Sequence, residues 1–154
     1  MKLSDEEFQK IVTDIMVINK NLSDPEHLKG LTGDVLSYIG TKLAAMKSLL
    51  IETKVQAHQD FLDAETEYKA VKARAIRRIT GTLIKEGGAK ISQSAAADLI
   101  YDEEDVKTAS LDRNKKEAFW TQLKNITSDT HDTIESIKGR VIDLQGARKD
   151  ERLG

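Results

Sequence analysis

A single stripe of apolar and small side chains extends from Val35 to Leu83, with no proline to interrupt it. Its members are three or four residues apart, which is the spacing along one face of an α-helix. They are Val35, Ile39, Leu43, Met46, Leu50, Thr53, Ala57, Phe61, Ala64, Tyr68, Val71, Ala75, Ile79 and Leu83. The sequence therefore predicts one long helix over residues 34–86, which ends at the glycine pair that follows it.

The N-terminal part of the chain predicts a shorter helix. Ser4 and Glu7 have the spacing of a capping box, which satisfies free amide groups at a helix start. Apolar residues follow at helical spacing, so we expect a helix over residues 5–20. The only proline, Pro25, comes after a polar break and suits the first turn of a short helix capped by Asp24.

A second long helical pattern covers residues 94–146. It begins with a short helix near Ser94, weakens between Lys107 and Lys116, where the pattern allows a break, and then continues. The polar tail 147–154 is expected to fray. No stretch shows the sustained alternation that is typical of strands. We therefore expect residues 1–154 to form one all-α domain, a long antiparallel helical hairpin with a short extra N-terminal helix.

The composition favours narrow helix seams over a wide core. Aromatic residues make up only 5 % of the chain and charged residues 32 %, so few large side chains are present to fill a compact interior. An oligomer or an elongated protein is expected for such a chain. There is no cysteine, no apolar leader at the start and no stretch apolar enough to span a membrane, which together favour a cytoplasmic protein.

The sequence contains no recognisable motif for catalysis or for metal binding. The three histidines, His27, His58 and His131, do not pair at a metal-binding helical spacing. No phosphate-binding glycine loop and no nucleophile motif is present. We therefore expect a protein that is not an enzyme and that has no metal site and no cofactor.

The charges are unevenly distributed along the chain, although the formal net charge is only −2. Six basic residues without an acidic one gather near the end of the long predicted helix: Lys69, Lys72, Arg74, Arg77, Arg78 and Lys85. They could neutralise the phosphates of a nucleic acid, or they could form a solvated face near a helix C-terminus. In a third interpretation they pair with the acidic run from Asp102 to Asp105, within the chain or between subunits.

Two short patterns resemble the phage recombination mediator family of the UvsY type. One is Lys72-Ala73-Arg74, which is similar to a Lys-Ala-Arg element near the end of that family's long helix. The other is the aromatic pair Phe119-Trp120 after the acidic lead-in Glu104-Asp105-Val106. The pair is followed at similar spacing by Ile134, Ser136, Ile142, Leu144, Gln145 and Arg148.

The resemblance implies a helical protein that binds single-stranded DNA, assembles into a homo-oligomeric ring and helps load a phage recombinase onto DNA coated with single-strand-binding protein. It implies a DNA-binding role for Lys72 and Arg74 only. Lys69, Arg77, Arg78 and Lys85 are candidates on local charge alone. The alternative function is a helical structural or interaction protein, such as a virion scaffold, a chaperone-like hairpin or an inhibitor of a host defence protein.

Overall fold

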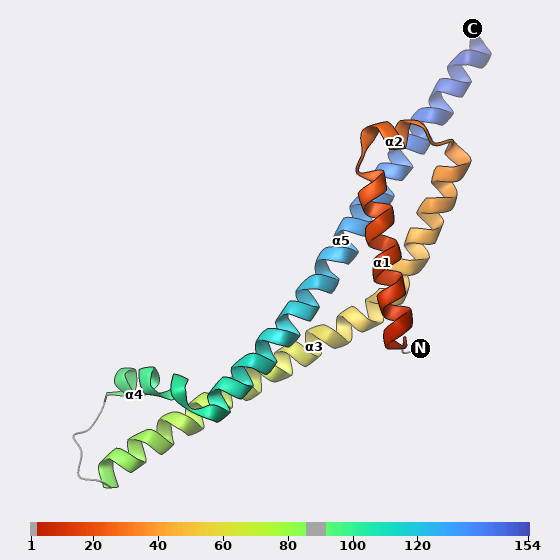
Figure 1. Ribbon diagram of the computed structural model, residues 1–154. Coiled ribbons are helices and arrows are strands. Elements are labelled where there is room, and N and C mark those ends of the chain that lie inside the picture. The colour runs from red at the N-terminus through yellow and green to blue at the C-terminus, as the bar shows by residue number, and fades with distance from the viewer. Residues whose placement is uncertain (1–2, 86–91) are drawn as a thin grey trace. The chain divides into compact units, whose positions relative to one another are not determined.

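The structure is a computed structural model that describes residues 3–85 and 92–154, with the backbone only for residues 82–85 and 93. Every regular element in these ranges is helical, which confirms the all-α fold. α3 packs against α5 as a long antiparallel hairpin, and α1 is the extra N-terminal helix (Figure 1). The elements are α1 (Asp5–Leu22), α2 (Pro25–Lys29), α3 (Gly33–Lys85), α4 (Gln93–Leu99), the 3₁₀ turn η1 (Ile100–Asp102) and α5 (Glu104–Leu153).

The helix bounds differ from expectation mainly at the C-terminus. α5 is continuous through the weak stretch between Lys107 and Lys116, and it continues past Gly146 to Leu153, where the sequence predicts an end and a frayed tail. A glycine costs a helix only about 1 kcal/mol relative to alanine, and the residues after Gly146 are mostly good helix formers. The predicted end of α3 at residue 86 and the glycine pair after it lie outside the described residues.

Two compact units make up the chain, and each contains part of both long helices. The first unit comprises residues 1–55 and 122–154, and the second comprises residues 56–121.

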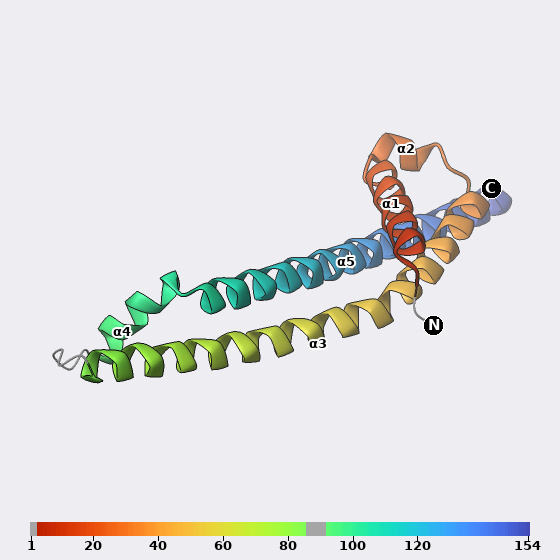
Figure 2. The same ribbon diagram turned by 60° about the horizontal axis from the view of Figure 1, so that its bottom comes forward.

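In the first unit, α1 lies beside both long helices (Figures 1 and 2). The capping box predicted at its start is present: the Glu7 amide donates to Ser4 Oγ at 3.3 Å, and the Ser4 amide donates to Glu7 Oε2 at 2.9 Å. The core contains residues of α1, α3 and α5, and fully burying each large aliphatic side chain contributes roughly 1.5–3 kcal/mol. Its buried members are Val12, Ile15, Leu22, Leu36, Leu43, Met46, Leu50, Ile126, Ile134 and Ile137.

Among the described residues, the second unit has a smaller buried cluster than the first. α4 and η1 follow the C-terminal part of α3 and return the chain to the start of α5 (Figure 2). Ile100 of η1 and Val106 of α5 are buried against Val71 and Ala75 of α3. These contacts fix the short segment between Ile100 and Val106 along the side of α3 that carries the basic residues.

Candidate functional site

The basic stretch lies on the part of α3 that belongs to the second unit. Lys69, Arg74, Arg77 and Arg78 are exposed, and Lys72 is half-buried. The side chain of Lys85 lies outside the described residues. Five of the six candidate cations can therefore be placed.

Two of these cations pair with carboxylates of their own helix. Lys69 Nζ lies 3.5 Å from Glu65 Oε1, and Arg74 Nη2 lies 2.6 Å from Glu67 Oε1. Both pairs are largely solvent-exposed, where an ion pair adds little to stability and exchanges readily. They lower the net positive charge that the stretch presents to a ligand.

Arg78 pairs with two carboxylates outside α3. Its Nη2 donates to Glu103 Oε2 and to Asp105 Oδ2, each at 3.0 Å. The hydrogen bond with Asp105 raises the pKa of Arg78, and the same contact lowers the pKa of Asp105. The acidic run thus pairs with the basic stretch within the chain, which is one of the interpretations that the sequence allowed for the basic residues. Arg77 forms no ion pair with any residue in the described ranges.

A cluster of two tyrosines and two cations lies beside these ion pairs. Lys72 Nζ lies 5.3 Å from the ring centre of Tyr68 and 5.4 Å from that of Tyr101. The guanidinium carbon of Arg113 lies 5.3 Å from the Tyr68 ring centre. These distances are within the range of cation–π attraction. Tyr101 is 53 % exposed, so the cluster is accessible from solvent.

Sequence reasoning identified Lys72 and Tyr68 but missed Tyr101 and Arg113. Tyr101 comes from η1 and Arg113 from α5, so neither shares the helical stripe that pointed to the basic stretch. The sequence signal that could have found Tyr101 is the pair Ile100 and Val106, which flank the acidic run. Apolar residues at both ends of such a run favour packing of the run against the helical hairpin.

Trp120 has a different environment. Its ring stacks on His58 with 4.4 Å between ring centres, and it lies 5.4 Å from Phe61. Both partners belong to α3, so Trp120 is an anchor between the two long helices. Tyr101 is the more accessible ring for a ligand.

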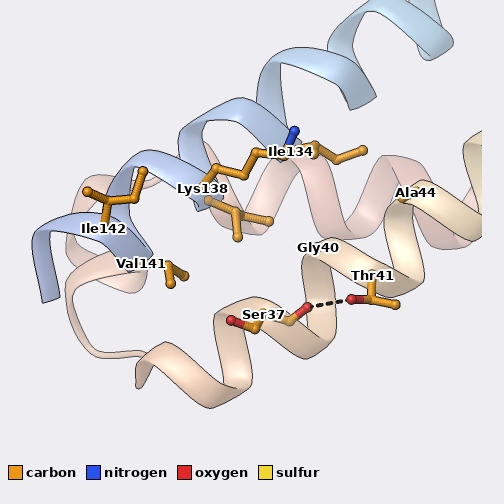
Figure 3. Close-up of a pocket in the computed structure, with 9 residues that line it drawn as sticks. Ser37, Gly40, Thr41, Ala44, Ile134, Lys138, Val141 and Ile142 are labelled. Carbon is orange, nitrogen blue, oxygen red and sulfur yellow. Dashed lines mark hydrogen bonds between the residues drawn. The ribbon is translucent and has the colours of Figure 1, made fainter. Parts of the chain in front are cut away.

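The first unit contains an apolar hollow of about 500 Å³ between α3 and α5 (Figure 3). Its α3 wall consists of small residues, and the Thr41 hydroxyl donates to the Ser37 carbonyl at 3.0 Å, so that polar group is satisfied within the helix. Its α5 wall consists of Ile134, Ile137, Lys138, Val141 and Ile142. Ile142 is 65 % exposed, so the hollow presents apolar surface to solvent.

Within the described ranges, no group of three or more histidine and carboxylate side chains is placed to hold a metal ion. None of the helices described contains a segment both long and apolar enough to cross a membrane. No protein-family profile matches the chain, and no curated protein or solved structure is significantly similar to it.

Proposed function

We propose that this protein binds single-stranded DNA and acts as a recombination mediator that helps to load a phage recombinase. The cluster of Lys72 with Tyr68 and Tyr101 is the observation that supports the proposal best. Single-strand-binding surfaces combine cations that follow the phosphates with aromatic rings on which bases stack. Here Tyr101 offers an accessible ring, while Lys72 and the exposed Arg77 offer positive charge.

The mediator role itself is supported by the resemblance carried by Lys72-Ala73-Arg74 and by the last helix. That resemblance also suggests the partners, namely a recombinase, single-strand-binding protein and further copies of this chain. Such a protein would act in the cytoplasm of the phage host. The exposed apolar residues of both long helices, among them Val55 and Ile142, are consistent with a homo-oligomer.

The DNA role is tested by fluorescence anisotropy with a labelled oligothymidylate over a range of salt concentrations. Lys72→Ala should weaken binding about threefold and reduce the salt slope by about 0.7, the value for one phosphate contact on a single strand. Lys10→Ala, which removes the same charge from α1 in the first unit, is the matched control and should bind as wild type.

Stacking is tested separately on Tyr101. Tyr101→Ala should weaken binding on the order of tenfold, because a base stacked on an aromatic ring contributes about 1–3 kcal/mol. Tyr101→Phe keeps the ring and should retain most of the affinity, and Tyr38→Ala removes an exposed tyrosine elsewhere as a control. Absence of binding at low salt, or equal losses for Tyr101→Ala and Tyr38→Ala, would contradict the proposal.

A second candidate is the helical structural or interaction protein, and the apolar hollow of the first unit favours it. In that case the wild-type protein should capture a partner protein from nuclease-treated host lysate. Ile142→Asp should abolish this capture, whereas Tyr101→Ala should leave it unchanged. Light scattering adds the oligomeric state: an assembly of several subunits supports the mediator, and a monomer opposes it.

A further inference from the structure

Among the basic residues of the stretch whose side chains the structure describes, Arg78 has the most contacts with carboxylates of the chain itself. It donates to Glu103 and Asp105 at 3.0 Å each, while Lys72 and Arg77 have no carboxylate partner in the described part of the chain. A guanidinium binds carboxylates and phosphates with the same planar geometry. Both carboxylates accept from Nη2 of Arg78, which is one of the nitrogens that a phosphate would use.

The segment that supplies these carboxylates is anchored at both sides. Ile100 and Val106 are buried against α3, so the backbone between them is fixed. The ion-paired side chains are not buried: Arg78 is 52 % exposed, Glu103 38 % and Asp105 44 %. Arg78 can therefore exchange its carboxylates for a phosphate by side-chain rotation, without any movement of the helices.

The same segment also carries Tyr101, which contacts Lys72 of α3. A strand of DNA stacked on Tyr101 would pass close to Arg78, because Arg78 binds Glu103, only two residues after Tyr101 in the chain. The carboxylates that hold Arg78 thus lie beside the ring proposed to hold a base.

We propose that Glu103 and Asp105 act as an intramolecular substitute for phosphate, which occupies Arg78 in the free protein and lowers its affinity for single-stranded DNA. The inference rests on the proposed DNA-binding function and concerns its regulation. The contact is autoinhibitory: a strand must displace the carboxylates before Nη2 of Arg78 can bind a phosphate. Weakly bound or short strands are therefore disfavoured relative to long ones that make many contacts.

The test measures oligothymidylate binding by anisotropy for Asp105→Asn, with Glu104→Gln as the matched control. Glu104 is the neighbouring residue in the first turn of α5, is exposed, and forms no ion pair with a described residue. Both variants remove one negative charge at the same helix N-terminus. Thermal unfolding of both variants checks that the fold is kept.

Asp105→Asn should bind about threefold to tenfold more tightly than wild type at low salt, with a salt slope steeper by about 0.7, because one more phosphate contact forms. Glu104→Gln should change affinity less than twofold. In an Arg78→Ala background, Asp105→Asn should have no effect, because the residue that it releases is absent.

Three results would overturn the inference, and each is recognisable. If wild type binds but Asp105→Asn and Glu104→Gln gain equally, or if the gain persists without Arg78, the effect is general charge and only the inference fails. If neither wild type nor any variant binds at any salt concentration, the proposed function fails and the inference fails with it. Binding that appears only in Asp105→Asn and requires Arg78 supports both.

Discussion

At the scale of single residues, the chain uses two kinds of polar contact with different consequences. The ion pairs around Arg78 are exposed, so they exchange readily with solvent. The contact between Asn19 of α1 and Thr130 of α5 is instead partly buried: Asn19 Nδ2 donates to Thr130 Oγ1 at 3.3 Å, Thr130 is fully buried and Asn19 is half-buried. A buried polar group that loses its partner costs far more than an exposed one.

Thr130→Val should therefore lower the free energy of unfolding by about 1–2 kcal/mol, because Asn19 Nδ2 loses its acceptor while the side-chain volume hardly changes. Urea denaturation measures the change. Thr127→Val is the matched control, since the buried Thr127 hydroxyl donates only to carbonyls of its own helix in the described structure. Equal losses in the two variants would show that the contact to α1 contributes nothing.

At the scale of elements, the helices could be predicted from the sequence because their stripes repeat every three or four residues over long stretches. The capping box at Ser4 and the proline turn at Pro25 were equally local and were also predictable. The contacts of the candidate site were not, because they depend on which residues of the segment after α4 come to lie against α3. A stripe of alanine, threonine and valine fits its partner in several registers, so it does not specify that Asp105 meets Arg78.

The glycines within the long helices give a test at this scale. Gly139→Ala should raise the free energy of unfolding by about 0.5–1 kcal/mol, since alanine favours helix and nothing described lies within 4 Å of the added Cβ. At Gly40 the Cβ would lie 3.3 Å from Ile137 Cγ2, so part of the gain is lost to repacking. Thermal or urea unfolding of both variants should rank Gly139→Ala above Gly40→Ala, and the reverse order would contradict the packing described at α3.

At the scale of the whole molecule, the net charge is only −2, because the many basic and acidic residues nearly balance. Many of them form local ion pairs on the surface. Among the described residues, three carboxylates have a pKa below the usual value, each because a hydrogen bond favours its charged form. They are Glu7, bonded to the backbone and side chain of Ser4; Asp105, bonded to Arg78; and Glu135, bonded to Lys138. A lowered pKa means that the unfolded chain binds protons more readily than the folded one.

The stability that these three groups contribute should accordingly be constant above about pH 5 and fall as the pH drops below about 4, through their lowered pKa values. Urea denaturation at a series of pH values measures this. Glu7→Gln should flatten the acid limb slightly, whereas Glu6→Gln, on the same turn but without the capping contact, should leave it unchanged. A protein that became more stable on acidification would contradict these assignments.

The stacking of the chain's one tryptophan on His58 and Phe61 has an optical consequence. All three rings belong to the second unit, so tryptophan emission follows the melting of that unit alone, while far-ultraviolet circular dichroism follows the helices of both. If the unfolding curves from the two signals superimpose, the two units unfold in one cooperative step. If the curves are displaced from each other, one unit unfolds before the other. Trp120 is thus an intrinsic fluorescent probe of the second unit. Comparing its emission with circular dichroism tests whether unfolding of one unit spreads along α3 and α5 to the other.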